Sequence, residues 1–458
     1  MEKTKYLILG AGFSGLSTSY HIGHGKCLVL EKTPDLYGHC KSKYRDEYYW
    51  DEGPHVSFSN IEYIKKLFSE SVKHQYAEYE VKVGNYYKGS WIDHPAQVNL
   101  YQVPEPLRSE CIKSFKISNT LENIEVDNYS QWLDAAFGEV FARSFPAAYT
   151  RKYWTCEPID LEVSWVGRRV HRPKESDVIK GAIGPLNKQT HYIKKVRYPR
   201  EGGYESFGSI MADKSNVKND HEVVKIDLDK KIVSCSNGRK FSYEVLVSTI
   251  PLPVFVSACE QRTPLVSKEV DKLKCTSGYL VNVVVPHKAI RDENWLYVYD
   301  ENFISTRITY ADKLDGKEKN NCLLQVEVYE SDYRKLNLSE KEIVETVVTE
   351  LRDMELIQDD FITGDNKIKS HLTKFKWGNV IFNHERKCAL DKILNWLAGY
   401  GLIREEGDLD AMADWESEIE KKIGNVILAG RFSQWNYYWS DDCVMRGKEI
   451  SEMIDGIS

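Results

Sequence analysis

Several patterns that would identify an enzyme class directly are missing from this chain. Its 10 cysteines are scattered over 458 residues without a C-x-x-C pair or a metal-like spacing, so we expect no metal site and no disulfide framework. No Ser-His-Asp arrangement, P-loop or H-E-x-x-H motif is found. Because the side chains offer no such catalytic set, these absences favour chemistry carried by an organic cofactor.

Excess positive charge and long apolar segments are missing too. The net charge of −7 argues against a general nucleic-acid-binding protein, although it allows local basic pockets. No apolar run is long enough to span a bilayer, and residues 1–5 lead straight into the first expected strand. We therefore expect no transmembrane segment and no secretory signal. Free thiols then favour a cytoplasmic location. The 42% hydrophobic and 29% charged residues are typical of a globular protein, and the length suggests two or three domains.

The most informative pattern opens the chain. An apolar run leads into a G-x-G-x-x-G motif formed by Gly10, Gly12 and Gly15, and a second apolar run over 27–30 ends at Glu31. Gly10 allows a sharp turn, Gly12 leaves room for a pyrophosphate, and Gly15 lets a helix pack close to the strand. A carboxylate 21 residues after Gly10 is placed to accept hydrogen bonds from ribose hydroxyls. This context predicts a dinucleotide site rather than a glycine-rich surface turn.

The later patterns predict a discontinuous α/β protein. Apolar spacing predicts helices at 60–72, 339–357 and 442–454, and a largely helical, aromatic-rich stretch over 105–180. Residues 79–92 read as a hairpin that turns at Gly84-Asn85, and 278–330 as an antiparallel sheet. We expect a Rossmann-like nucleotide-binding domain interrupted by a helical domain and an antiparallel-sheet substrate domain. The predicted segments are 1–95, 196–255 and 391–458 for the first, 96–195 for the second and 256–390 for the third.

Four further segments are candidates for a site, and each has a simpler interpretation. His55 follows Gly53-Pro54, where a fixed loop could hold it beside a cofactor ring or merely bond it to backbone. The aromatic and basic stretch 149–172 could stack on a base and bind a diphosphate, or form a solvated helix end. Gly202-Gly203 could admit a ligand or make a simple turn. The segment 430–445 could close a ligand site with a helix start, capped by Asp441 or Asp442, or simply pack in the core.

Taken together, these motifs resemble the flavin-dependent enzymes of the amine-oxidase-like superfamily, and within it the UDP-galactopyranose mutases and the protoporphyrinogen-oxidase-like flavoproteins. The resemblance covers most of the chain as ordered motifs and implies FAD as cofactor. It implies that His55 lies against the flavin and that Val223 gives backbone contacts to adenine. The implied cofactor-binding residues are Gly10, Gly12, Phe13, Ser14, Gly15, Glu31, Lys32, Gly38, His39, Cys40, His55, Val223, Gly430, Arg431, Asp441, Cys443 and Val444.

The resemblance also implies a substrate side, with departures. Trp154 is similar to the mutase tryptophan on the uridine side, and Arg172 to the mobile-loop arginine that clamps the diphosphate. The second clamp arginine is missing from 377–383, where Arg386 is the nearest arginine, and Trp439 stands in place of an expected aspartate. The implied catalytic residues are His55, Arg172, Arg431 and Tyr437, and the implied substrate residues are Trp154, Arg168, Arg172, Tyr204, Arg307 and Tyr437.

Two functions follow as hypotheses from this resemblance. The first is a mutase-like enzyme of glycan or polysaccharide biosynthesis, which uses reduced flavin as a nucleophile on a nucleotide-activated sugar. The second is an oxidoreductase that takes hydride from an amine, an alcohol or a ring carbon. A non-enzymatic nucleotide-binding protein and a nicotinamide-only dehydrogenase are weaker alternatives. The expected partner is a nucleotide sugar or another small molecule, with no nucleic acid, and a homo-oligomer is left open.

Overall fold

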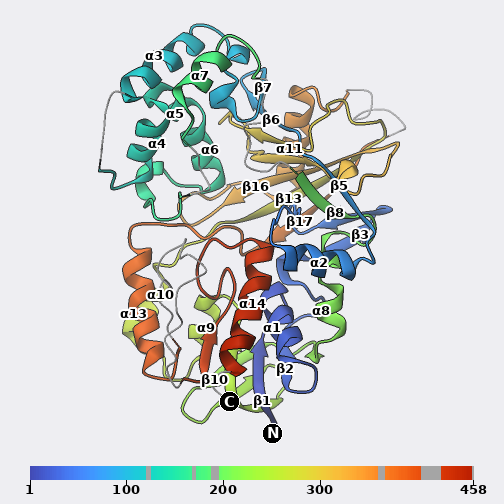
Figure 1. Cartoon of the computed structure of the whole chain (residues 1–458), viewed down its shortest axis with the longest axis vertical. Coiled ribbons are helices and arrows are strands. Elements are labelled where there is room, and N and C mark those ends of the chain that lie inside the picture. Colours follow the sequence, from blue (N-terminus) through green and yellow to red (C-terminus); the bar gives the residue numbers. More distant parts are fainter. Residues whose placement is uncertain (120–124, 168–171, 187–194, 359–366, 404–423, 456–458) are drawn as a thin grey trace.

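The computed structural model describes residues 1–119, 125–167, 172–186, 195–358, 367–403 and 424–455. Its elements form three parts, which Figure 1 separates clearly. A first sheet with its helices fills the lower half, a group of helices lies at the upper left, and a second sheet lies at the upper right. Both chain ends lie at the bottom of the lower half. In the described part of the chain, no helix combines the length and apolar character needed to cross a membrane.

The first sheet combines strands from the beginning, the middle and the end of the chain. Its order is β10-β11-β12-β1-β2-β9, with β18 also beside β12. The strands β12, β1, β2, β9 and β18 run parallel, whereas β10 and β11 are antiparallel. The strands are β1 (Glu2–Leu9), β2 (Cys27–Leu30), β9 (Val217–Lys218), β10 (Val223–Asp227), β11 (Ile232–Cys235), β12 (Lys240–Ser248) and β18 (Val426–Leu428).

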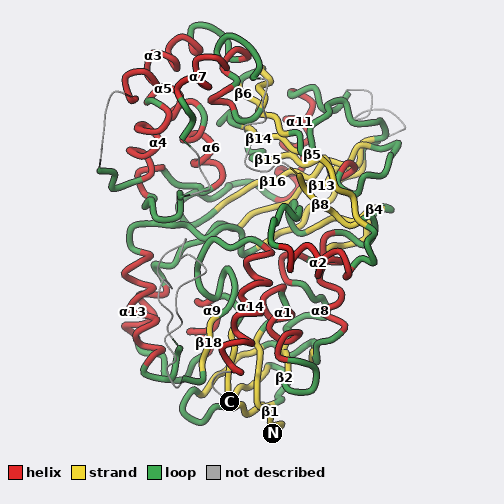
Figure 2. Tube along the Cα trace, in the orientation of Figure 1, coloured by secondary structure: helices red, strands yellow, loops and turns green. Residues whose placement is uncertain are grey.

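Helices cover both faces of this sheet, as the alternation in β1 requires (Figure 2). Tyr6 and Ile8 belong to a core with α1, α2, α8 and α14, while Leu7 and Leu9 belong to another with α9, α10 and α13. Burial on both faces explains the continuous apolar runs of the parallel strands. The helices are α1 (Phe13–Ile22), α2 (Glu62–Ser71), α8 (Ser209–Asp213), α9 (Leu252–Ala258), α10 (Pro264–Val270), α13 (Arg386–Ala398) and α14 (Ser440–Asp455).

Two glycines set how closely α1 packs. A Cβ on Gly15 would lie 2.0 Å from the carbonyl oxygen of Gly10, so only glycine lets α1 start this near to β1. A Cβ on Gly447 would lie 2.5 Å from the backbone nitrogen of Thr18, so glycine also lets α14 lie directly on α1. The last described helix is therefore locked against the first one.

The second sheet has the order β17-β13-β16-β15-β14-β6-β7 and is antiparallel except for the pair β14–β6. One face packs on α11 (Glu340–Asp353) through Ile343, Val347 and Leu351. Several side chains of the other face line the cavity described below. The strands are β6 (Val83–Tyr87), β7 (Ser90–Asp93), β13 (Ser277–Val285), β14 (Trp295–Val298), β15 (Arg307–Tyr310), β16 (Cys322–Glu330) and β17 (Lys369–Phe375).

The third part is helical, and two further sheets of two strands each lie outside the large sheets. Its helices are α3 (Leu107–Asn119), α4 (Tyr129–Phe137), α5 (Glu139–Ser144), α6 (Pro146–Tyr153) and α7 (Glu175–Gly181). The two-stranded pairs are β3 (Ser42–Arg45) with β4 (Tyr48–Asp51), and β5 (Tyr76–Glu80) with β8 (Lys195–Pro199). Short 3₁₀ turns are η1 (Gly38–Cys40), η2 (Ala96–Val98), η3 (Leu100–Gln102), η4 (Pro158–Asp160), η5 (Tyr204–Gly208) and η6 (Ala311–Lys313).

The expected fold class is confirmed, but one turn was wrongly placed. Gly84-Asn85 lies inside β6, and the hairpin turns at Lys88-Gly89, where both residues have positive φ. Gly84 is there for packing, because a Cβ would lie 2.9 Å from a side-chain carbon of Leu296 on β14. The strands β6 and β7 complete the second sheet, although their residues were assigned to the first nucleotide-binding segment. The five-segment division itself stays a prediction.

Candidate active site

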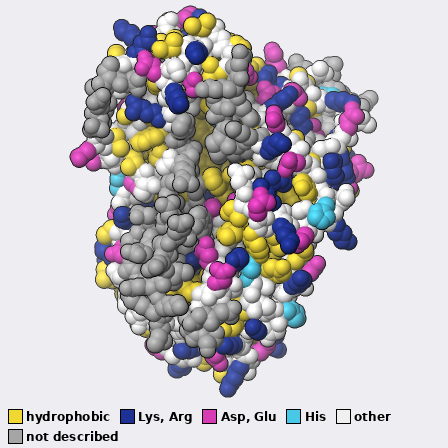
Figure 3. Space-filling view, viewed as in Figure 1, with side chains coloured by type: hydrophobic (Ala, Val, Ile, Leu, Met, Phe, Trp, Pro, Cys, Tyr) yellow, Lys and Arg dark blue, Asp and Glu magenta, His cyan; other side chains and the backbone are white. Residues whose placement is uncertain are grey.

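A cavity of about 1080 Å³ lies where the three parts meet. Its lining comes from the glycine motif and β2, from the loops around η1 and His55, from α4 and α6, and from the second sheet. The loop after β17 and the segment 430–443 complete it. On the face drawn in space-filling form, hydrophobic side chains gather near the level where the lower and upper parts adjoin (Figure 3).

The glycine motif forms one end of this cavity. Gly10 has φ +96°, and Gly12 precedes α1 without giving a side-chain cap, which leaves backbone N–H groups of the first turn for a ligand. A Cβ on Gly12 would meet nothing nearer than the Cα of Gly38 at 3.8 Å. The Glu31 carboxylate accepts hydrogen bonds from the Ala11 N–H at 2.9 Å and from the Thr33 N–H at 3.2 Å. The carboxylate of Glu31 thus holds the glycine loop and the residues after β2 together, at the position predicted for a ribose.

Most predicted cofactor residues line the cavity, and three do not. Gly15 serves helix packing, Val444 is buried with its carbonyl accepting from the Ser17 hydroxyl at 2.6 Å, and Asp441 lies in the first turn of α14. Asp442, the third residue of α14, accepts from the N–H of Trp439, the residue before the helix, at 2.7 Å, as the third residue of a capping box does. The residues that line the cavity are Gly10, Gly12, Phe13, Ser14, Glu31, Lys32, Gly38, His39, Cys40, His55, Val223, Gly430, Arg431 and Cys443.

His55 is fixed in one protonation state. Its Nδ1–H donates to the Gly53 carbonyl at 2.8 Å, so the backbone bond of the simpler interpretation is present and the ring still lines the cavity. The ring stacks on Tyr204 with centroids 5.3 Å apart. Burial, with the nearby positive charges of Arg307 and Arg431, lowers the pKa of His55 to about 4. At neutral pH its Nε2 therefore carries no proton and can only accept a hydrogen bond.

Two acidic residues before His55 hold this loop in place. Asp51 accepts hydrogen bonds from the Tyr198 hydroxyl at 2.9 Å and the Tyr204 N–H at 3.0 Å. Burial raises the pKa of Asp51 to about 6 despite these bonds. Burial would also raise the pKa of Glu52, but His39 and Lys41, at 2.8 and 2.9 Å, hold it at about 2.

The half of the cavity away from the glycine motif is lined by the predicted substrate residues Trp154, Arg307 and Tyr437, and we call it the substrate half. It is rich in hydroxyl and aromatic groups. The alternation of β14 and β16 directs Tyr297 and Tyr329 into it, and α6 contributes Tyr149 and Tyr153 from the opposite side. Trp154 lines the cavity but is 5% exposed, and its ring lies 5.9 Å from that of Tyr437. None of these four tyrosines was predicted as an individual site residue, although Tyr149 and Tyr153 lie in the aromatic stretch 149–172 that the sequence offered as a candidate.

Arg307 is already paired inside this half. Its Nε and Nη2 donate to both carboxylate oxygens of Glu327, the second at 3.0 Å. Tyr329 donates to the same carboxylate at 2.5 Å. Burial favours loss of the arginine proton, but the adjacent carboxylate outweighs it and raises the pKa of Arg307 further. The pair contributes no net charge to the cavity.

Arg431 has no such partner among the described residues. Its Nη2 donates to the Asn379 side-chain oxygen at 2.8 Å, and its Nη1 to the Tyr438 carbonyl at 3.3 Å. The guanidinium carbon lies 4.6 Å from the ring centre of Tyr437, which is a cation–π distance. Neutral acceptors leave the positive charge of Arg431 uncompensated.

Two lysines add to this positive charge. Lys374 and Lys376 line the cavity and are exposed, and no carboxylate pairs with either in the described part of the chain. Their ammonium groups instead lie 5.2 Å from the ring centres of Tyr279 and Trp377. With Arg307 neutralised by Glu327, the substrate half carries an excess of positive charge.

Other predicted substrate residues lie apart from the cavity lining. Tyr204 is fully buried, lies beside His55 and bonds its hydroxyl to that of Ser440 at 2.6 Å. Arg172 is exposed and is not among the lining residues. Arg168 lies outside the described residues. Arg386 is 1% exposed, donates to the Trp435 carbonyl and does not line the cavity, so it supplies no clamp there.

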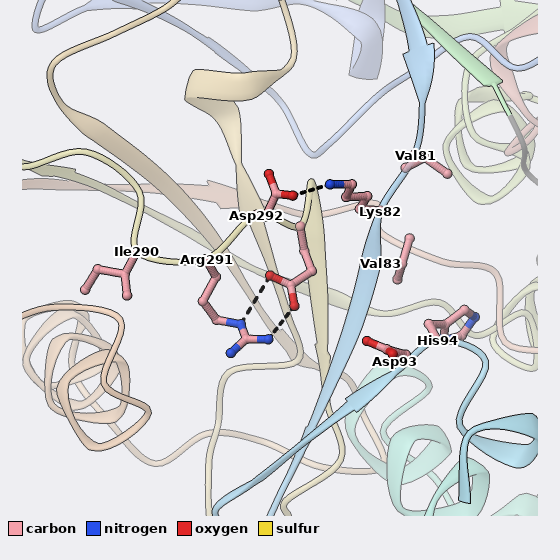
Figure 4. Close-up of a pocket in the computed structure, with 9 residues that line it drawn as sticks. Val81, Lys82, Val83, Asp93, His94, Ile290, Arg291 and Asp292 are labelled. Atoms are coloured by element: carbon pink, nitrogen blue, oxygen red, sulfur yellow. Dashed lines mark hydrogen bonds and ion pairs between the residues drawn. The ribbon is translucent and has the colours of Figure 1, made fainter. Parts of the chain in front are cut away.

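A second, smaller cavity of about 570 Å³ lies beside β6 and shares His94 with the large one. Its lysine and its arginine each pair with a carboxylate of the same cavity, as Figure 4 shows. Lys82 pairs with Asp292, and Arg291 pairs with Glu293. Self-paired charges leave little for a charged ligand to satisfy. Among the described residues, no group of three His, Cys, Asp or Glu side chains could hold a metal ion.

Comparison with known proteins identifies the family of this chain. The model of the flavin containing amine oxidoreductases matches residues 13–454. The chain belongs to this family. Solved structures with the same fold include a reduced UDP-galactopyranose mutase, with 20% identity, 99% of this chain and 96% of the other covered, and a TM-score of 0.86. A protein named as a protoporphyrinogen oxidase from Exiguobacterium sp. 255-15 has 12% identity, 99% coverage of both chains and a TM-score of 0.72. Cyclohexylamine oxidase from Brevibacterium oxydans IH-35A has 14% identity, 99% coverage of both and a TM-score of 0.65.

As a flavin containing amine oxidoreductase family member, the protein is a FAD-dependent enzyme. The residues present fit FAD. The uncapped start of α1 and the open space at Gly12 suit a pyrophosphate, and the carboxylate of Glu31 suits a ribose. Gly430, with φ +90°, is pressed so close to Ser14 that a Cβ would lie 2.3 Å from its hydroxyl. The C-terminal segment thereby closes the cavity over the glycine motif.

Proposed function

We propose that this FAD-dependent enzyme acts on a nucleotide-activated sugar by mutase-like chemistry without net oxidation, in the biosynthesis of a glycan. The observation that carries the proposal is the uncompensated positive charge of Arg431, Lys374 and Lys376 in a cavity lined by tyrosines. A diphosphate is a strong partner for such a group of cations, and hydroxyl groups suit the hydroxyls of a sugar. An amine is itself cationic at neutral pH, so the same charges oppose its binding.

Each residue then has a role that its contacts allow. Arg431 binds a phosphate oxygen of the substrate, and Tyr437, held against its guanidinium, contacts the same group. Trp154 borders the base, and Arg172 stays a predicted clamp that would have to approach from outside the lining. His55 keeps its proton on Nδ1, so its Nε2 accepts a hydrogen bond beside the cofactor ring. When bound, FAD supplies a nucleophilic nitrogen in its reduced form and a hydride acceptor in its oxidised form.

A second candidate is an oxidoreductase that removes hydride from an amine, an alcohol or a ring carbon. The aromatic lining favours it, since Tyr149, Tyr297 and Tyr329 surround much of the space. The amine oxidase of known structure with the same fold supports the fold alone, because it shares 14% identity. The excess positive charge makes the first candidate the better supported one for this cavity.

One anaerobic experiment separates the two candidates. The purified holoenzyme is incubated with UDP-galactose and related nucleotide sugars, with and without dithionite, while flavin absorbance and sugar products are followed. An isomer formed only by reduced enzyme is the expected result. Bleaching of oxidised flavin by a sugar would establish the oxidoreductase instead, and no response in either state would refute the nucleotide-sugar proposal.

Matched variants test the charge argument in the same assay. Arg431→Gln removes the uncompensated cation and is expected to lower turnover and UDP affinity. Arg200→Gln removes a half-buried arginine outside the cavity and should change neither. Equal behaviour of the two variants would show that the charge of Arg431 has no part in binding.

A further inference from the structure

Asn379 lies in the loop after β17, in the segment 377–383 that has no clamp arginine, and its backbone is held rigidly. Its N–H donates to the Thr276 hydroxyl at 2.8 Å, and its carbonyl accepts from the Thr276 N–H at 2.8 Å. The residue is 5% exposed and lines the cavity. A side chain fixed in this way can hold its neighbours in place, because it has little freedom of its own.

The side-chain oxygen of Asn379 joins three parts of the protein. It accepts a hydrogen bond from the Tyr153 hydroxyl of α6 at 2.8 Å and from Arg431 Nη2 of the C-terminal segment at 2.8 Å. The Tyr153 hydroxyl in turn lies 3.3 Å from that of Tyr437, on which the guanidinium stacks. Both lone pairs of the oxygen are therefore used to orient groups at the edge of the substrate half.

The side-chain nitrogen of Asn379, Nδ2, indicates that asparagine is less favourable than aspartate for the stability of this site. This nitrogen is buried and makes no hydrogen bond of normal geometry among the described residues, although it lies close enough to the Tyr329 hydroxyl to oppose the rise in the pKa of Tyr329 that burial causes. A buried donor without a well-formed hydrogen bond costs free energy. An aspartate of the same shape would avoid this cost, would still accept from Tyr153, and would form an ion pair with Arg431. The amide differs from that aspartate chiefly in leaving the charge of Arg431 uncompensated.

We propose that Asn379 is a positioning residue that aims Arg431 into the substrate half and preserves its positive charge for an anionic substrate group. Through Arg431, it thereby helps to bind the substrate anion that an arginine in the segment 377–383 would otherwise bind. The inference rests on the proposed function, since it requires a substrate with a phosphate or similar anion.

Asn379→Asp is the decisive variant, because it changes charge with almost no change of shape. Binding of UDP and of inorganic pyrophosphate to the oxidised holoenzyme is measured by calorimetry, and thermal stability is measured on the same samples. The variant should weaken binding of both probes by about ten- to a hundredfold, the range spanned by one charge-assisted hydrogen bond. Its melting temperature should stay equal or rise, since the poorly bonded donor is gone.

Asn383→Asp is the matched control. Asn383 lies in the same segment, is 6% exposed and does not line the cavity, and its side-chain amide donates to the Tyr333 hydroxyl. This variant should bind both probes like the wild type. A further variant combines Asn379→Asp with Arg431→Gln, and its loss of binding free energy should be smaller than the sum of the two single losses, because Asn379 acts through Arg431.

The outcomes separate the two proposals. If wild-type enzyme binds UDP or pyrophosphate and Asn379→Asp binds it equally well, the role of Asn379 is refuted while the proposed function stands. A loss of binding that accompanies a lower melting temperature would indicate a merely structural residue and also refute the role. If wild-type enzyme binds neither probe, the proposed function fails, and the role of Asn379 fails with it.

Discussion

Gly12 and Gly15 belong to one motif, and the structure predicts that replacing each by alanine has a different consequence. Gly12 has φ −73° and ψ 178°, which alanine adopts freely, and the nearest neighbour of its Cβ would be 3.8 Å away. Such a substitution leaves the apoprotein unchanged or stabilises it by up to about 1 kcal/mol, because the unfolded chain loses freedom. The Cβ that Gly15→Ala adds would instead lie 2.0 Å from the Gly10 carbonyl oxygen, so α1 has to move. Overpacking of this severity costs about 3 kcal/mol or more of unfolding free energy.

The affinity for FAD should be lowered strongly by Gly12→Ala, although this variant keeps the stability of its apoprotein. A methyl group at residue 12 occupies the space through which a pyrophosphate reaches the N–H groups of α1. Loss of one or two charge-assisted hydrogen bonds, each of about 1.5–3 kcal/mol, weakens FAD binding by roughly a hundredfold or more. Gly12→Ala is thus expected to be a stable apoprotein that does not retain FAD.

The assay uses FAD-free protein, so that cofactor binding does not contribute to stability. Urea unfolding is followed by tryptophan fluorescence, and FAD affinity is measured by reconstitution. The reasoning is refuted if the Gly12→Ala apoprotein is as destabilised as that of Gly15→Ala. It is equally refuted if Gly12→Ala binds FAD with the affinity of the wild type.

Two further predictions concern buried charged or titratable groups. Burial holds the pKa of His55 at about 4, below the value of about 6.5 in an unfolded chain, so the unfolded state binds more protons between these values. His55 therefore makes stability fall as pH drops from about 6.5 to about 4, and melting curves of His55→Gln should show a weaker fall over that window; an unchanged profile would contradict this. Arg307→Gln leaves the 4% exposed Glu327 side chain without its cation and should lower the unfolding free energy by about 3–5 kcal/mol. Urea unfolding should show partial recovery in Arg307→Gln with Glu327→Gln, and no recovery would mean that Glu327 is not the cause.

The nucleotide-binding end could be predicted from sequence because its determinants are local. The turn at Gly10, the start of α1 and the carboxylate of Glu31 all lie within one β-α-β unit, and spacing alone relates them. His55 could be predicted as well, since glycine and proline fix its loop. The competing interpretation was also correct in part, because the same ring bonds its own backbone while lining the cavity.

The substrate half could not be predicted in this way because its residues meet only in the folded chain. Tyr153, Asn379 and Arg431 are separated by 226 and 52 residues, and a single side-chain oxygen joins them. Arg307 was predicted as a substrate residue, and no local pattern indicates that Glu327, 20 positions later, neutralises it. The misplaced turn at Gly84 has the same origin, because the reason for that glycine lies on β14, a distant strand that runs parallel to β6.

The position of β18 and α14 has a consequence for how the enzyme is made in the cell. The segment after β18 and the start of α14 close the cavity over a glycine motif that is synthesised more than 400 residues earlier. While the ribosome is still adding residues, the first strand and helix exist without β18 beside β12 and without α14 on α1. FAD capture thus belongs to the last stage of synthesis, and a nascent chain arrested before residue 426 should emerge as colourless apoprotein even where the cofactor is abundant.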